Sequence, residues 1–137
     1  AQLDLSPLGI DRIEGFGFVL HADRTVVASS EHEVNDLESA GIGVWQRLRG
    51  GKIGMGVFNF RIGTDGGCAG IFGVVPPGNC VLKLGATLDR AKGGGLVGNA
   101  FLSFETLDGV VVPIPVPLPI VMERLSLEDF PRPMPTP

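Results

Sequence analysis

The residues of this chain that are best suited to binding are aromatic side chains placed at alternate positions. Phe16 and Phe18 form one such pair, and Phe58 and Phe60 form another. Side chains two residues apart point to the same face of a strand, so each pair would present two rings together. Rings that line a cavity bind apolar or aromatic molecules through burial and ring contacts. The full set of candidate ligand-binding residues is Phe16, Phe18, Trp45, Arg47, Phe58, Phe60, Phe72 and Phe104. The alternative interpretation is that these rings only fill a core.

Trp45 and Arg47 are also two residues apart and would share a face. In a small barrel, an arginine stacked on a tryptophan closes one end of the interior. We therefore expect a structural cap here, with anion binding by Arg47 as the alternative.

Acid–base or metal chemistry has few candidates in this sequence. His21 and His32 are the only histidines, there is no tyrosine, and no Cys/His spacing matches a metal site. The sequence therefore predicts no metal and no cofactor, and it identifies no catalytic residue. The one arrangement left open is an acid–base pair, in which His21 or His32 meets Glu105 across a barrel mouth.

The two cysteines, Cys68 and Cys80, allow one disulfide at most. If residues 76–79 form a tight hairpin turn, Cys80 faces Val75, and Cys68 lies several residues away along the ladder. That separation is too large for a disulfide within the hairpin, so this register favours free, buried cysteines. A disulfide would instead indicate that residues 68–80 form a loop.

Short extended segments must position these side chains, because strand signals recur about every ten to twelve residues. Gly50-Gly51 separates two of these segments and provides the positive φ angles that tight hairpin turns require. The candidate strands are residues 15–21, 25–28, 41–49, 52–62, 68–75, 80–88, 96–106 and 110–122.

This pattern predicts an all-β fold, a small antiparallel up-and-down barrel of about eight strands. The alternative is a two-sheet β-sandwich, which tolerates open edges. We expect residues 1–124 to form a single barrel domain and residues 125–137 to form a proline-rich C-terminal tail.

Residues 113–119 carry a proline at every second position. Prolines spaced by two remove the backbone donors on one side of a strand, while Ile114, Val116 and Leu118 keep theirs on the other. This segment should therefore be an edge or seam strand. Full closure of the barrel would then depend on what lies along the proline side.

Several short motifs accompany this strand pattern. The first is an extended segment with a turn, and the second is a strand that contains the tryptophan and its neighbouring arginine. In chain order the motifs are His21-Ala22-Asp23-Arg24-Thr25-Val26-Val27, Gly43-Val44-Trp45-Gln46-Arg47, Val57-Phe58-Asn59-Phe60, Asp65-Gly66 and Gly95-Leu96-Val97-Gly98-Asn99-Ala100.

Together these motifs resemble the small lipocalin-like, or calycin-like, barrel domains of bacteria and fungi, over about residues 16–106. Arg24 stands where that family has a turn glycine. The resemblance implies a calycin-like barrel but brings no activity, because such barrels range from carriers to cyclases.

Composition narrows the range of partners. The net charge is −4 and the basic residues form no stripe, which argues against nucleic acid. No apolar run reaches the roughly 18 residues that span a bilayer as a helix. The chain begins at Ala1 without a methionine, which indicates either a mature end left by removal of a secretion signal or a trimmed chain; the compartment is undetermined, with secretion slightly favoured.

Three functions are consistent with these features. The first, which we favour, is a non-enzymatic barrel that binds a hydrophobic or aromatic small molecule in its interior. The second is a barrel-type cyclase or isomerase that shapes an apolar substrate and needs few polar groups. The third is an assembly protein that uses the 113–119 edge strand. Strands that are apolar on both faces also suggest a homo-oligomer that covers part of the exterior.

Overall fold

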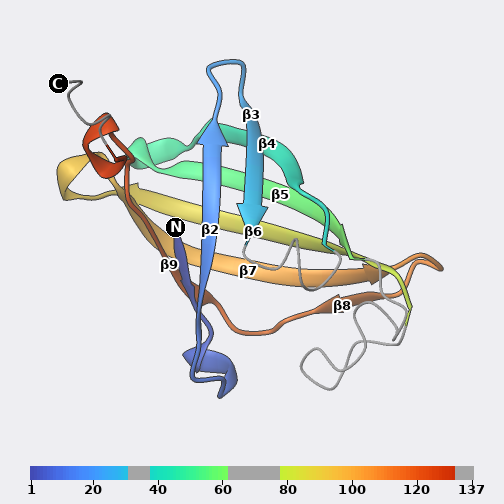
Figure 1. Cartoon of the computed structure of the whole chain (residues 1–137). Coiled ribbons are helices and arrows are strands. Elements are labelled where there is room, and N and C mark those ends of the chain that lie inside the picture. Colours follow the sequence, from blue (N-terminus) through green and yellow to red (C-terminus); the bar gives the residue numbers. More distant parts are fainter. Residues whose placement is uncertain (31–37, 62–77, 132–137) are drawn as a thin grey trace, which may run out of the picture.

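The chain folds into a closed antiparallel barrel (Figure 1). This computed structural model describes residues 1–30, 38–61 and 78–131. Eight strands form the wall in the order β6-β5-β4-β3-β2-β1-β9-β7, and β7 pairs back onto β6 to close the ring. A ninth strand, β8, lies beside β7 along the same edge as β9. The predicted all-β barrel is therefore confirmed, and the sandwich alternative is wrong.

The strands alternate with short connections, and the described residues contain only single 3-10 turns as helical structure. No helix in this described part is long and apolar enough to span a membrane. The strands are β1 (Gln2–Asp4), β2 (Ile13–Leu20), β3 (Thr25–Ser30), β4 (Gly41–Arg47), β5 (Ile53–Arg61), β6 (Cys80–Arg90), β7 (Leu96–Thr106), β8 (Val111–Pro113) and β9 (Leu118–Met122). The 3-10 turns are η1 (Ser6–Leu8), η2 (Arg49–Gly51), η4 (Lys92–Gly94) and η5 (Leu127–Asp129).

Strict alternation along β6 and β7 builds the core. Leu84, Ala86 and Leu88 of β6 are buried, while the residues between them face outward. Their partners on β7 continue the same inner layer, with Ala100, Leu102 and Phe104 all buried. Period-two burial of this kind is what a barrel wall with one packed face requires.

One predicted hairpin is wrong. Residues 68–75 were expected to pair with residues 80–88, but both edges of β6 are occupied by other strands. β5 pairs with Cys80–Leu88 on one edge, and β7 pairs with Cys80–Arg90 on the other. Residues 68–75 lie outside the described residues, and the eighth strand of the ring is instead β1, which the sequence pattern did not indicate.

The expectation of free cysteines is also wrong. Cys80 is buried and disulfide-bonded, and the chain has one other cysteine, Cys68, which lies outside the described residues. The expectation depended on the hairpin register between residues 68–75 and 80–88. Because β6 pairs with β5 and β7 instead, the distance argument against a disulfide no longer applies.

The proline-bearing segment pairs along one side, as predicted. The Ile114 N–H donates to the Leu102 carbonyl at 2.9 Å, and Leu118 pairs with Ala100, so these residues turn their backbone donors toward β7. The segment is not one continuous strand, because β8 ends at Pro113 and β9 begins at Leu118. β7 of the same barrel thus pairs with Ile114 and Leu118, two of the three residues whose donors the sequence assigned to an assembly partner.

On the proline side, the N-terminal strand completes the seam. β1 lies between β2 and β9, where Leu3 pairs with Glu14 on one side and with Ile120 on the other. β1 is only three residues long, and it pairs with β9 at Ile120 and Val121, just beyond Pro119. The ammonium group of Ala1, the residue before β1, donates to the Phe16 carbonyl at 2.6 Å, and partial burial lowers the pKa of this amine.

Two glycines mark places where the wall bends too tightly for a side chain. A Cβ at Gly43 would lie 1.9 Å from the Gly56 carbonyl oxygen, and one at Gly98 would lie 2.0 Å from the Thr87 carbonyl oxygen. Both glycines are inside strands, at the close backbone approaches that curve a sheet into a small barrel.

We expect Gly43→Ala and Gly98→Ala each to lower the free energy of unfolding by about 3 kcal/mol, because the new methyl group must displace backbone atoms. Gly15→Ala is the matched control, since a Cβ there meets nothing within 4 Å. Urea unfolding of the three variants would measure the effect. Equal midpoints for Gly43→Ala and Gly15→Ala would show that the wall does not need the glycine.

Candidate functional site

Two of the predicted aromatic residues face the barrel interior together. The side chains of Phe16 and Phe18 project from β2 toward the core, where their ring centroids are 5.9 Å apart in a stacked arrangement. They lie opposite Ser30 and Ala28 of β3 in the strand register. The alternation that the sequence suggested for this strand is therefore correct.

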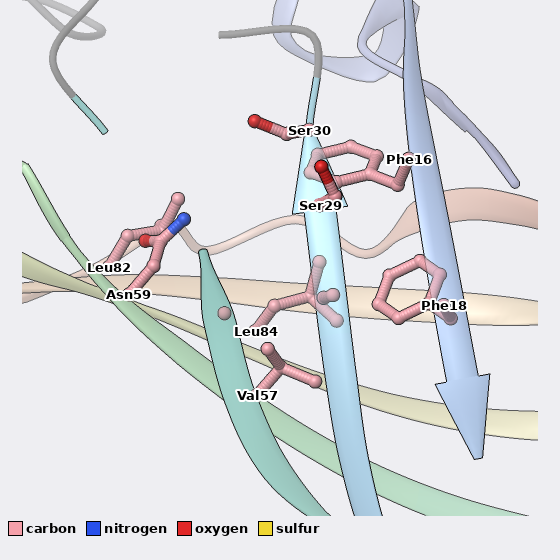
Figure 2. Close-up of a pocket in the computed structure, with 10 residues that line it drawn as sticks. Phe16, Phe18, Ser29, Ser30, Val57, Asn59, Leu82 and Leu84 are labelled. Atoms are coloured by element: carbon pink, nitrogen blue, oxygen red, sulfur yellow. The ribbon is translucent and has the colours of Figure 1, made fainter. Parts of the chain in front are cut away.

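These rings form one wall of a small chamber inside the barrel (Figure 2). Val57, Leu82 and Leu84 lie across from the rings, and Asn59 is at the end of the chamber near Ser30. The free room is about 20 Å³, which suffices for about one water molecule. As it stands, the chamber is almost filled by its own side chains.

A buried polar cluster adjoins this chamber. The Glu38 carboxylate accepts hydrogen bonds from Asn59 Nδ2 and from Ser30 Oγ, the latter at 3.0 Å, and its side chain is only 3% exposed. Arg61 Nε lies 3.8 Å from Glu38 Oε2 and supplies the opposite charge. Because Asn59 donates to Glu38 through Nδ2, this hydrogen bond fixes the orientation of the amide and so the position of its Oδ1 atom.

The Asn59 Oδ1 atom has no hydrogen-bond partner among the described residues, although it is buried. Leaving a buried acceptor without a donor costs about 1–3 kcal/mol. Asn59 lines the chamber, and its amide is a polar group in an otherwise mainly apolar space.

A second and larger hollow opens through the barrel wall. β1 begins at Gln2, which pairs with Gly15, and the Phe16 N–H donates to the Ala1 carbonyl at 2.9 Å; among the described residues, none pairs with residues 17–20 on this side of β2. Figure 1 shows the N-terminus part of the way along the gap between β2 and β9. The hollow has a volume of about 810 Å³, and its lining includes Phe16, Phe18, Leu20, Leu96, Met122 and Arg124. We call it the lateral slot.

The chamber and the lateral slot share Phe16 and Phe18. This aromatic pair therefore lies between the two hollows. Rotation of a partly buried phenylalanine side chain would join the two, since such rings change rotamer without moving the backbone.

Phe58 and Phe60 do not line the interior, which corrects the prediction. Phe60 is 47% exposed, the two rings contact each other edge to face, and Val57 and Asn59 occupy the inward positions of β5. Both faces of this strand are apolar in the sequence. Since a shift of one residue exchanges the two faces, the pattern did not distinguish inside from outside.

An arginine does stack on Trp45, but it is Arg24 and not Arg47. The Arg24 guanidinium lies 4.4 Å from the centre of the Trp45 ring, whose Nε1 donates to the His21 carbonyl at 2.8 Å. Arg24 has a φ of 74°, at the position where the resembling family has glycine. Stacking on the indole offsets the cost of this left-handed conformation. Arg47 is exposed at the end of β4. Neither Trp45 nor Arg47 lines the chamber or the lateral slot.

The remaining predicted residues have other places. Phe104 is 2% exposed and belongs to the packed core, while Phe72 lies outside the described residues. His32 lies outside them as well. His21 follows β2 at one end of the barrel, whereas Glu105 is near the other end, on the outer face, and pairs with Lys83 at 2.6 Å. The proposed pairing of His21 with Glu105 is therefore wrong.

The polar residues of the site were missed in the sequence. In the sequence, Glu38 belongs to an acidic stretch that is typical of a solvated loop, and Asn59 lies between two phenylalanines. No spacing in the sequence links Glu38 to Asn59, because the two come together only where Glu38 forms a β-bridge with Arg61. Among the described residues, no group of three or more His, Cys, Asp and Glu side chains could hold a metal ion.

We expect Glu38→Ala to lower the free energy of unfolding by about 3 kcal/mol, because it removes the buried acceptor and counter-charge of the polar cluster. Glu105→Ala removes the more exposed pair with Lys83 and should cost less than about 1 kcal/mol. Denaturant titration of both variants gives the comparison. If the two losses were equal, the cluster would contribute no more than a surface pair.

Comparison with known proteins found no matching family model, no similar curated protein and no similar solved structure.

Proposed function

We propose that this protein is a calycin-like barrel that binds a small, mainly hydrophobic molecule carrying one hydrogen-bond donor. The observation that carries the proposal is the lateral slot beside Phe16 and Phe18. Its volume of about 810 Å³ falls within the roughly 300–1,000 Å³ typical of ligand sites. The activity is binding without catalysis.

Entry through the slot explains how a ligand could reach an interior that is nearly full. The apolar part of the molecule would lie against the two rings, replacing their exposure to solvent with ring contacts. If the Phe18 ring rotates toward the slot, the chamber opens behind it. A hydroxyl or amine on the ligand can then donate to Asn59 Oδ1 and displace a water from that position.

The chemistry of the lining supports binding more than reaction. The residues around the chamber are mostly apolar, and its polar groups are two serines and an amide. Glu38 is close by, but it already accepts two hydrogen bonds and faces Arg61. The cyclase or isomerase alternative stays a prediction, without a residue of the described site that favours it.

A matched pair of probes tests this proposal. 1-Naphthol has an apolar ring system and one hydroxyl, whereas 1-methylnaphthalene has the same shape without a donor. We expect the protein to bind 1-naphthol with a Kd of about 100 μM, from roughly −0.5 kcal/mol for each non-hydrogen atom. One satisfied hydrogen bond should make 1-methylnaphthalene bind about fivefold more weakly. Isothermal titration calorimetry measures both.

Three variants locate the site. Phe18→Ala should weaken both probes, whereas Asn59→Leu should remove the difference between them, because the hydroxyl loses its acceptor. Phe101→Ala is the control, since this exposed ring is on the outer face and its loss should change neither affinity. Absence of binding to the folded wild type would refute the proposal. A Phe101→Ala effect as large as that of Phe18→Ala would also do so.

A further inference from the structure

Four exposed arginines lie around one mouth of the barrel, at the end where β2, β4 and β6 turn into the next strands and where β9 stops. We call them the arginine rim: Arg24, Arg47, Arg90 and Arg124. Arg47 and Arg90 are the last residues of β4 and β6, and each comes two residues after a side chain of the core, Trp45 and Leu88 respectively. Because side chains two residues apart share a face of a strand, both arginines continue inward-facing rows onto the rim.

Direct contacts place the other two arginines at the same mouth. The Arg24 guanidinium lies 4.4 Å from the centre of the Trp45 ring, and the backbone N–H of Trp45 donates to the Arg24 carbonyl at 2.9 Å. Arg124 follows the end of β9 by two residues and lies against the β6–β7 turn, where a Cβ at Gly94 would be 3.5 Å from Arg124 Cδ. The rim therefore takes one arginine each from the ends of β3, β4, β6 and β9.

The register of the wall keeps these arginines at about one level. Arg47 pairs with Ile53, and Arg90 lies two residues beyond the residue that pairs with Ile53 on its other side. Arg90 pairs with Leu96, and Arg124 likewise lies two residues beyond the β9 partner of Leu96. Rows of paired residues slope around a barrel because its strands are tilted, and these two-residue steps offset the slope. Since a barrel of this size is only wide enough for side chains to fill, long side chains from this rim can reach one ligand over the mouth.

The four guanidinium groups have no counter-charge of their own. Among the described residues, none of them forms an ion pair with a carboxylate. Two of the carboxylates at this end are bound elsewhere, since Asp89 pairs with Lys52 at 3.2 Å and Asp23 accepts from the Thr25 N–H at 3.0 Å. Unpaired guanidinium groups gathered at one mouth form a site that attracts anions.

Other basic residues reinforce this charge. Arg49, Lys52 and Lys92, in the turns beside the rim, bring seven of the eleven basic residues of the chain to this end. Five acidic residues of the described chain lie there as well, namely Asp23, Asp89, Glu123, Glu128 and Asp129. This end is thus positive in a chain whose net charge is −4. The sequence shows no basic stripe because these residues come from separate turns and strand ends.

The conformation of Arg24 indicates that the rim is prepared for a ligand. Its φ is 74°, which costs free energy for a residue other than glycine, whereas in the two neighbouring turns glycines take every positive φ. Arginine at this position holds its guanidinium over the indole of Trp45, and Trp45 is itself held by the His21 carbonyl. A binding group that is already held in place loses less entropy when the ligand arrives.

We propose that the arginine rim binds a small molecule that carries two or more phosphate groups. The planar fork of a guanidinium matches phosphate oxygens through paired, charge-assisted hydrogen bonds. Four such groups around one mouth carry more positive charge than a single phosphate balances, so a diphosphate or a larger group fits better. Arg47 and Arg90 line neither the chamber nor the lateral slot, so this inference is independent of the ligand proposed above.

Isothermal titration calorimetry with inorganic pyrophosphate at low ionic strength tests the proposal. We expect a Kd of about 100 μM, which added salt should raise because the attraction is electrostatic. Arg47→Gln and Arg90→Gln should each raise this Kd by about tenfold, since each removes one charge-assisted pair of hydrogen bonds. Arg47→Lys keeps the charge but loses the fork, and it should raise the Kd by about threefold.

Arg12→Gln is the matched control, because it removes the same charge from the connection between β1 and β2 at the opposite end of the barrel. It should leave the Kd for pyrophosphate unchanged. A folded wild type that does not bind pyrophosphate would overturn the proposal. An equal loss in Arg12→Gln and Arg47→Gln, or a wild-type Kd in Arg47→Lys, would also overturn it, because either result indicates general charge attraction without a site.

Vesicles that contain phosphatidylinositol bisphosphate distinguish the two sources of such a ligand. Once pyrophosphate binding is established, sedimentation with these vesicles that Arg47→Gln abolishes would support the rim and assign a lipid headgroup. Binding of pyrophosphate without such sedimentation would support the rim and assign a soluble molecule. Duplex DNA that binds at least about 100-fold more tightly than pyrophosphate would overturn the proposal, because the ligand would then be a polymer.

Discussion

A backbone constraint at the end of the sheet shapes much of this barrel. Prolines at every second position from Pro113 to Pro119 leave backbone donors on one side only, and β7 takes that side. The other side of the seam is completed by the three residues of β1, which meet β9 only at Ile120 and Val121. Among the described residues, β1 closes the wall at Ile120 and Val121, and the lateral slot lies next to this pairing, beside Met122 and Arg124, at the end of β9 away from the prolines.

This arrangement gives the two faces of the wall different roles. Inside, side chains of β2, β3, β5 and β6 fill most of the chamber and leave room for about one water molecule. Phe16 and Phe18 line both this chamber and the lateral slot. Outside, exposed apolar side chains are spread around the wall from β2 to β7, and a hollow lies over Gly56 and Gly85.

The outcome of the sequence analysis differs from one feature to the next for physical reasons. The strands around Gly50-Gly51 were found because positive φ at both glycines is a local requirement, and both glycines have it. The inward direction of Phe58 and Phe60 was misjudged because β5 is apolar on both faces and period two does not say which face is inner. β1 was missed because three residues give no periodic signal. Glu38 and Asn59 were missed because a polar cluster built from distant segments leaves no spacing in the chain.

Local chemistry was enough to establish the all-β class, the turn at Gly50-Gly51 and the one-sided pairing of the proline segment, because each depends on the conformations of a few adjacent residues. The closing partner of the barrel, the inner face of β5, the arginine that stacks on Trp45 and the buried cluster around Glu38 all depend on which distant strands become neighbours. That choice follows from the burial of the whole core and from the register around the complete ring, which no single segment contains.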